Sequence, residues 1–364
     1  MPITTRAAVY DGEPALVIRD VILRDPGPGE VLVRIGASGV CGSDRHVLDG
    51  DWTMPRPTVM GHEGAGVVEA VGEGVRTLSP GDHVIMTWFY PCTVCASCRE
   101  GRTWVCTGSN AEACLLPDGS TPLELDGTAA YPYLAVGSMS ERVVVAEQAA
   151  IKVPQELPFD VAALIGCSIA TGVGAVVNDA QVKPGRSALV IGAGGVGISI
   201  VMGLALVGAS PIIVADITDA SLELAREFGA THTIRSGPDL AERVREIVPD
   251  GVDFAFEAIG RAETIGLMPT TLTRGGVAVV VGLPPQDSPV AIDVLALAEG
   301  GKTLIGSNYG STVPARDFPL LARLFLDGRL PVDRLITNRV ALDEVNDAFD
   351  LMRSGARGRS VIMM

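Results

Sequence analysis

Basic side chains are the scarce charged group in this sequence. The 28 lysines and arginines are outnumbered by 43 aspartates and glutamates, so the formal net charge is −15 at pH 7. A surface of this sign repels phosphate backbones and anionic lipid headgroups. We therefore expect no nucleic acid and no membrane among the partners of this protein.

Aromatic residues make up only 4% of the chain, whereas glycine (43 residues) and proline (24) are abundant. This composition suits a globular protein with many buried strands and tight turns. The first residues, MPITTRAA, lack the apolar segment that is typical of a signal peptide. Seven cysteines in such a sequence favour reduced thiols and metal ligands over disulfides, and we expect a cytoplasmic protein.

No charged residue occurs between Ser187 and Ala215, and a stretch of this length could be taken for a membrane span. Gly192, Gly194, Gly195 and Gly197 and later Pro211 interrupt it, and its pattern changes from strand-like to helix-like. We predict a buried strand–helix–strand unit here.

The chain is long for a single hydrophobic core, so we expect two domains. Residues 6–40 and the following segments to Met86 have the pattern of short strands, without a helix-length periodic segment, which predicts a β-barrel-like domain. Residues 107–135 have the composition of a loop. From Ser187 strands alternate with helices, which predicts a doubly wound parallel sheet. After Leu304 the pattern changes again, and the chain end is expected to return to the first domain.

Four cysteines lie within fifteen residues and can close a tetrahedral shell, as a structural zinc requires. The alternative is four unrelated thiols, and a seventh cysteine, Cys114, is interpreted as a spare thiol. The four cysteines are Cys92, Cys95, Cys98 and Cys106.

A second ligand set is spread along the chain. Cys41 and His62 offer a thiolate and an imidazole, Glu63 adds a carboxylate, and Cys167 can supply a further thiolate. Taken alone, Cys41 and His62 also fit a buried thiol and a core imidazole. Zinc accepts this ligand chemistry, and a catalytic zinc keeps one position open for water or substrate.

A glycine motif follows the strand that ends at Ile191 and opens a helix. Its backbone can approach a pyrophosphate, which then meets the helix N-terminus. Asp216, at the end of the next strand, would accept hydrogen bonds from ribose hydroxyls and repel a 2′-phosphate, which favours NAD. The alternative is a glycine turn without a ligand. The motif comprises Gly192, Gly194, Gly195, Val196 and Gly197.

Together these motifs resemble the zinc-containing medium-chain alcohol dehydrogenases over nearly the full length of the chain. The resemblance is carried by Cys41-x-Ser43-Asp44-x-His46, Gly61-His62-Glu63, the four-cysteine segment, Gly166-Cys167 with Thr171, and the glycine motif with Asp216. It implies an α/β protein with an active site between two domains. Residues 1–166 and 306–364 would form a GroES-like β-barrel catalytic domain with a structural zinc lobe at 92–106, and residues 167–305 a Rossmann domain.

The resemblance also implies roles for single residues. Cys41, His62 and Cys167 would bind the catalytic zinc, with Glu63 as a transient ligand and Asp44 orienting the His62 ring. The remaining functional residues are implied to be the proton relay Ser43 and His46, the cofactor contacts Thr171 and Arg359, and the substrate-pocket residues Trp52 and Trp88.

Two positions depart from the family pattern. Gly42 stands where many relatives carry Arg or His against the pyrophosphate. Trp52 replaces an acidic residue of the relatives that oxidise the glutathione adduct of formaldehyde. For Trp52 and Trp88 an ordinary core role is the alternative, and His83 and His232 are expected to be structural.

The predicted function is the reversible, zinc-dependent oxidation of an alcohol to an aldehyde or ketone with hydride transfer to NAD. Primary alcohols with apolar or aromatic tails are the expected substrates. The alternatives are oxidation of a thiol-bound hydroxymethyl adduct and a non-catalytic nucleotide-binding protein on the same fold. We expect two zinc ions per chain and a homodimer or homotetramer.

Overall fold

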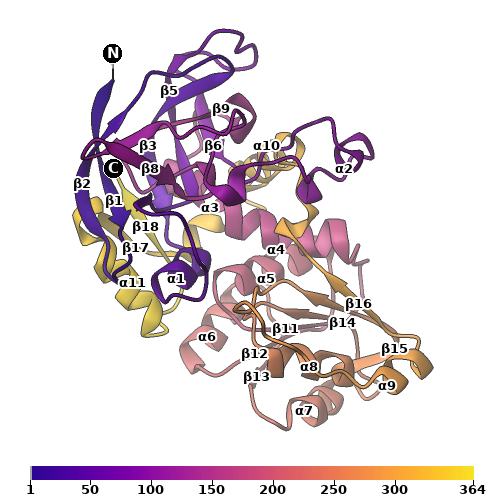
Figure 1. Cartoon of the computed structure of the whole chain (residues 1–364). Coiled ribbons are helices and arrows are strands. Elements are labelled where there is room, and N and C mark those ends of the chain that lie inside the picture. The colour runs from indigo at the N-terminus through magenta and orange to yellow at the C-terminus, as the bar shows by residue number, and fades with distance from the viewer. Residues whose placement is uncertain (1) are drawn as a thin grey trace. The chain divides into compact units, whose positions relative to one another are not determined.

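The computed structural model describes residues 2–364, which form two compact units (Figure 1). Unit 1 comprises the described residues up to Cys167 together with Val313–Ser354 and Arg359–Met364, and unit 2 comprises Ser168–Thr312 and Gly355–Gly358. Cys167 therefore belongs to unit 1 and residues 306–312 to unit 2, so both divisions fall later in the chain than the sequence suggested.

Unit 1 is built on two β-structures. A closed barrel has the strand order β1-β2-β7-β8-β4, and a seven-stranded sheet has the order β10-β6-β5-β3-β18-β17, with β9 paired to β3. The barrel strands are β1 (Ile3–Tyr10), β2 (Val17–Leu23), β4 (Thr58–Val59), β7 (Leu123–Leu125) and β8 (Thr128–Pro132). The sheet strands are β3 (Glu30–Gly39), β5 (Glu63–Val71), β6 (His83–Met86), β9 (Arg142–Ala146), β10 (Ala150–Lys152), β17 (Ile336–Ala341) and β18 (Arg359–Met363). The expected β-barrel is confirmed, and the last strand of the chain pairs with β3.

Among its described residues, unit 1 also contains five α-helices. They are α1 (Gly42–Leu48), α2 (Ala96–Arg99), α3 (Phe159–Leu164), α10 (Pro314–Leu326) and α11 (Val345–Arg353). Helix α1 was not predicted, because seven residues are too few to show a helical period. The helix is fixed instead at its N-terminus, where the Asp44 carboxylate accepts a hydrogen bond from the Cys41 N–H.

The expectation of a loop over residues 107–135 is wrong in its second half. Strands β7 and β8 form a hairpin there and complete the barrel. Asp126 and Gly127 connect them with φ angles of 51° and 78°, both in the left-handed region that a tight hairpin turn requires. The Asp-Gly pair was therefore a hairpin signal, but strands of three and five residues are too short to show alternation.

Unit 2 contains a six-stranded parallel sheet in the order β13-β12-β11-β14-β15-β16. The strands are β11 (Ala188–Ile191), β12 (Ile212–Asp216), β13 (His232–Arg235), β14 (Val252–Glu257), β15 (Leu272–Val280) and β16 (Thr303–Gly306). The helices are α4 (Ala170–Gly174), α5 (Gly195–Val207), α6 (Asp219–Glu227), α7 (Leu240–Ile247), α8 (Ala262–Thr271) and α9 (Val294–Glu299). The strand order is that of the doubly wound dinucleotide-binding fold, which confirms the predicted fold class.

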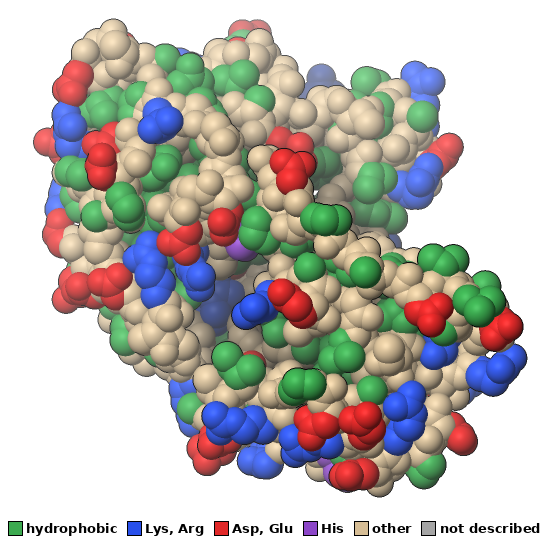
Figure 2. Space-filling view, turned by 60° about the horizontal axis from the view of Figure 1, so that its bottom comes forward, with side chains coloured by type: hydrophobic (Ala, Val, Ile, Leu, Met, Phe, Trp, Pro, Cys, Tyr) green, Lys and Arg blue, Asp and Glu red, His purple; other side chains and the backbone are tan. Residues whose placement is uncertain are grey.

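The charge-free segment from Ser187 to Ala215 forms β11, α5 and β12, as predicted. Within residues 2–364, one helix is long and apolar enough to cross a membrane, and it is a different segment, Phe159–Asp179. Of its most apolar window, 89% is buried inside the protein, which is typical of a core helix. On the face shown in Figure 2, acidic and basic side chains are interspersed, with hydrophobic side chains scattered among them.

Candidate metal and cofactor sites

The candidate ligands of the catalytic metal lie together in unit 1. One ligand atom each from Cys41, His62, Glu63 and Cys167 falls within 4.8 Å of all the others, and all four side chains are buried. Two sulfurs, an imidazole nitrogen and a carboxylate oxygen are thus gathered from three separate parts of the chain.

The sheet brings the first three of these residues together. Strands β3 and β5 are antiparallel, with Gly39 opposite Glu63, so Cys41 follows the end of β3 where Glu63 begins β5 and His62 directly precedes it. A Cβ at Gly39 would lie 2.0 Å from Glu63 Oε2, so only glycine leaves room for this carboxylate. Cys167 comes from a widened π-type turn, Ile165–Ile169, a deviation that often marks functional sites.

Asp44 holds two members of this cluster. Its Oδ1 is 3.1 Å from His62 Nδ1, its Oδ2 accepts the Cys41 N–H at 3.1 Å, and it is fully buried. Because a carboxylate can only accept, Nδ1 carries the ring proton and Nε2 is left free to bind a metal. The orienting role that the resemblance implied for Asp44 agrees with this geometry.

Glu63 forms a buried ion pair with Arg359. The Arg359 Nη2 donates to Glu63 Oε2 at 2.5 Å and to the Val40 carbonyl at 2.7 Å, whereas Glu63 Oε1 has no partner among the described residues. Burial raises the pKa of Glu63 to about 8, although the Arg359 charge opposes this. Arg359 is thus engaged beside the metal ligands, and its contact with a cofactor pyrophosphate stays a prediction.

The donor set fits a zinc ion. The hydrogen bond from Cys167 lowers the pKa of Cys41 well below its ordinary value, burial opposes this, and His62 and Arg359 lower it further. A site that favours a buried thiolate, with a free imidazole nitrogen and an unpaired carboxylate oxygen beside it, presents the ligands that zinc prefers.

The four-cysteine segment forms a second, separate cluster. The sulfurs of Cys92, Cys95, Cys98 and Cys106 lie within 4.8 Å of one another. Backbone N–H groups of Cys92 and Gly108 point at Cys106 Sγ, at 3.2 and 3.3 Å. Backbone donors from Cys98 and Thr107 lower the pKa of Cys95 to about 6. Four sulfurs without an oxygen donor fit a closed, structural zinc site.

The two relay residues lie on α1. Ser43 Oγ is 3.9 Å from Cys41 Sγ, and the Ser43 carbonyl accepts a hydrogen bond from the Tyr133 hydroxyl at 3.2 Å. His46 lies three residues further along the same helix, so the two side chains are neighbours one turn apart. The imidazole is 26% exposed, so the helix leads from the buried metal ligands towards solvent.

The two candidate pocket residues lie in different clusters of unit 1. Trp52 stacks on the His46 ring and packs against the core around Val47 and Leu48. Trp88 packs against the core of the large sheet and contacts Phe89 edge to face. Their place in a substrate pocket stays a prediction.

The glycine motif turns from β11 into α5 in unit 2. Gly192 has φ 95°, and a Cβ at Gly197 would lie 1.8 Å from the Gly192 carbonyl oxygen, so both positions require glycine. Gly194 caps α5, and a Cβ built there meets no atom within 4 Å. The helix N-terminus is thus open to an approaching phosphate.

Asp216 ends β12 beside this motif. Its Oδ2 accepts the Ala193 N–H at 2.8 Å and its Oδ1 the Thr218 N–H at 2.9 Å, which leaves lone pairs for ribose hydroxyls. One basic neighbour of Asp216 could not be recognised from local sequence: Arg235 is its register partner on β13. Its guanidinium pairs with Asp219 at 3.2 Å, so its charge is already partly neutralised.

The other expected residues are placed without an evident role. Thr171 is buried in α4. The His83 ring lies 4.8 Å from that of Phe159, and His232 is exposed on β13. The Cys114 thiol is buried beside Met54, away from both ligand sets.

A two-sulfur metal cluster in one unit and a dinucleotide-binding sheet in the other define a metal-dependent nicotinamide oxidoreductase. Two family models match the chain: "Alcohol dehydrogenase GroES-like domain" over residues 27–155 and "Zinc-binding dehydrogenase" over residues 195–327. Among curated proteins, the S-(hydroxymethyl)glutathione dehydrogenase of Paracoccus denitrificans is 37% identical over 99% of both chains.

Solved structures of alcohol dehydrogenases also resemble this chain over its full length. The zinc-binding-domain alcohol dehydrogenase of Burkholderia ambifaria superposes with a TM-score of 0.94 at 38% identity, covering 100% of both chains. The benzyl alcohol dehydrogenase of Acinetobacter calcoaceticus also gives 0.94, at 34% identity, covering 100% of this chain and 99% of that one. The chain belongs to the zinc-containing medium-chain alcohol dehydrogenases. It is an NAD-dependent enzyme of that family with two zinc ions per chain.

Proposed function

We propose that this enzyme oxidises primary alcohols with apolar or aromatic tails to aldehydes, reversibly and with NAD as the hydride acceptor. The observation that carries the proposal is the buried cluster of Cys41, His62, Glu63 and Cys167 with Ser43 beside it. The likeness to a benzyl alcohol dehydrogenase supports the aromatic class of substrate.

The residues of unit 1 would bind the catalytic zinc and position its ligands. Cys41, His62 and Cys167 would hold the catalytic zinc, and Glu63 would stand beside them as an alternative ligand. Zinc supplies a Lewis acid for the substrate oxygen, and NAD accepts the hydride. Asp44 keeps His62 in the tautomer that binds metal, and Arg359 holds Glu63 in place.

The proton of the alcohol needs a path to water. Ser43 would accept it first, since its hydroxyl lies beside the metal ligands and can donate and accept at once. His46, one helical turn further on and partly exposed, would pass the proton to solvent. Thr171, Asp216 and the glycine motif would bind the cofactor in unit 2.

The alternative substrate is a thiol-bound hydroxymethyl adduct, which the name of one relative supports. The relative from Paracoccus denitrificans is named for S-(hydroxymethyl)glutathione, a thiol-bound formaldehyde adduct. Trp52, in the position that is acidic in relatives of that type, stacks on His46 and offers no carboxylate. We therefore place the adduct second. We further propose a cytoplasmic homodimer or homotetramer.

A screen of NAD reduction across alcohol classes tests the proposal. We expect a higher kcat/KM for benzyl alcohol and medium-chain primary alcohols than for sorbitol, because an apolar pocket leaves extra hydroxyls unpaired at about 1–3 kcal/mol each. Comparable values for sorbitol and benzyl alcohol would contradict the apolar pocket. A much higher value for S-(hydroxymethyl)glutathione would select the second candidate.

A further inference from the structure

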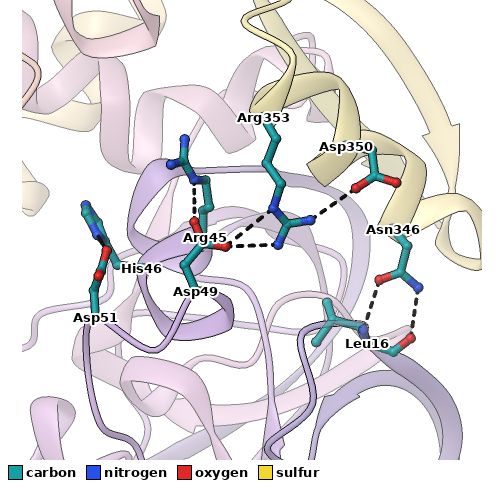
Figure 3. Close-up of polar contacts among 8 residues, drawn as sticks. All are labelled: Leu16, Arg45, His46, Asp49, Asp51, Asn346, Asp350 and Arg353. Carbon is teal, nitrogen blue, oxygen red and sulfur yellow. Dashed lines mark hydrogen bonds and ion pairs between the residues drawn. The ribbon is translucent and has the colours of Figure 1, made fainter.

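The ring of His46 is held on two sides by residues that the relay described above does not include. Its Nδ1 lies 2.7 Å from Asp51 Oδ2, and the Trp52 indole stacks on it with ring centroids 4.6 Å apart and an interplanar angle of 23°. Figure 3 shows the Asp51 side chain next to that of His46. The hydrogen bond to Asp51 and the stacking on Trp52 together fix the orientation of the imidazole ring.

The backbone fixes this arrangement as well. The His46 carbonyl accepts the N–H groups of both Asp51 and Trp52, at 2.9 and 3.2 Å. Gly50, two residues after the end of α1, has φ 80°, a conformation that turns the chain back over the helix. The carboxylate and the indole are therefore part of a closed turn around the residue that they contact.

The chemistry of the pair selects one tautomer of His46. An ionised carboxylate can only accept hydrogen bonds, so Nδ1 must carry the ring proton and Nε2 keeps its lone pair. The same logic operates at His62, where Asp44 binds Nδ1 at 3.1 Å and Nε2 is left for the metal. Each functional imidazole of unit 1 thus has a carboxylate on Nδ1.

We propose that Asp51 is a positioning residue of the proton relay, which holds His46 in the Nδ1–H tautomer so that Nε2 can accept the proton of the alcohol. This inference rests on the proposed function. The proton leaves the substrate hydroxyl, passes through Ser43 to Nε2, and forms an imidazolium ion whose charge Asp51 stabilises. Nε2 then releases the same proton to water, and His46 returns to its starting tautomer.

The other charged groups near this turn are engaged with one another. Asp49 accepts from Arg45 at 2.7 Å and from Arg353 of α11 at 3.2 Å, and Arg353 also pairs with Asp350 (Figure 3). Burial would raise the pKa of Asp49, but the hydrogen bonds from Arg45 and Arg353 hold it below its ordinary value. Asp49 is therefore a matched control: a carboxylate of the same turn that binds arginines and not His46.

Three variants of the zinc-loaded full chain test the proposal: Asp51→Asn, Asp51→Glu and the control Asp49→Asn. The chain has four histidines, so nitrogen NMR can report the tautomer of His46, whose signal is identified by its loss in His46→Gln. We expect Nδ1–H in the wild type and in Asp51→Glu. In Asp51→Asn the amide can donate to Nδ1, so the proton should move wholly or partly to Nε2.

The second measurement is the pH profile of kcat/KM for benzyl alcohol with NAD. For Asp51→Asn we expect a loss of about 10-fold near pH 7, part of the 10²–10⁴-fold that positioned bases contribute. The loss should shrink at high pH, where hydroxide takes the proton without His46. Asp51→Glu should recover most of the activity, and Asp49→Asn should keep the wild-type profile.

Retention of the Nδ1–H tautomer in Asp51→Asn would overturn the proposal. So would a loss of activity that does not change with pH, or an equal loss in Asp49→Asn, since both indicate a structural role. A wild-type enzyme that reduces NAD with none of the alcohols would refute the proposed function instead. The NMR measurement would then still decide whether Asp51 sets the tautomer of His46.

Discussion

Replacing Asp44 with asparagine should weaken zinc binding at the site of Cys41 and His62 and leave the four-cysteine site unchanged. Asp44 is fully buried and accepts two hydrogen bonds, from His62 Nδ1 and from the Cys41 N–H. Asparagine has nearly the same shape, but only one of its two terminal groups can accept. If its oxygen stays on the Cys41 N–H, its NH₂ group faces His62 Nδ1. That ring nitrogen must then become the acceptor, and the ring proton moves to the nitrogen that would bind the metal.

The size of the effect follows from the bonds that are lost. A hydrogen bond to a charged group contributes about 1.5–3 kcal/mol. At about 1.4 kcal/mol per factor of ten, this corresponds to roughly 10–100-fold weaker zinc binding at the site of Cys41 and His62. The four-cysteine site contains no group that Asp44 contacts, so its affinity should not change.

Titration with a chromophoric chelator measures both sites in one experiment. The wild type should release two zinc ions per chain, and Asp44→Asn should release one of them at a lower chelator concentration, together with its activity. Asp49→Asn, a carboxylate-to-amide change at the other end of α1, is the control. Unchanged release from Asp44→Asn would refute the tautomer argument, and one zinc ion in fully active wild type would refute the two-site prediction.

Three further predictions concern the structural zinc and the cofactor. Cys98→Ser should lower the melting temperature in calorimetry, because a closed zinc site stabilises the fold. Folded molecules of the variant should keep their kcat. An unchanged melting temperature would contradict this prediction. Steady-state kinetics should give a higher kcat/KM with NAD than with NADP, since Asp216 would face the 2′-phosphate of NADP and Arg235 is paired with Asp219. The opposite order would indicate that Arg235 binds the phosphate. Gly42→Arg should tighten NADH binding in a fluorescence titration, because it would supply the basic contact to the pyrophosphate that Gly42 lacks, and should lower kcat if product release limits turnover. A Cβ at Gly42 meets no atom within 4 Å, so the substitution has room to begin. Unchanged affinity would show that an arginine there does not reach the cofactor.

The fold could be predicted where the sequence pattern is regular over a sufficient length. The parallel sheet of unit 2 was predicted because strands and helices alternate from Ser187 onwards, with a glycine motif between the first strand and the first helix. In unit 1 the strand pattern predicted the barrel, but its shortest elements could not be predicted. Helix α1 has seven residues and β7 has three, and both are determined by caps, turns and neighbouring strands.

The sequence by itself determined the chemistry that is available. Two sets of thiols, one with an imidazole and a carboxylate, and a glycine motif followed by Asp216 already indicated zinc and a dinucleotide. These conclusions depend on residue type and local spacing, which are properties of the chain alone.

Only the tertiary structure decided which groups control these residues. The Glu63–Arg359 pair joins positions 296 residues apart, and the partner of Asp216 on the next strand, Arg235, is set by sheet register. Asp51 is only five residues from His46, yet a sequence cannot show that the turn at Gly50 brings its carboxylate to Nδ1. Hydrogen bonds act over about 3 Å, so the partner of each functional side chain is determined by the folded path of the backbone.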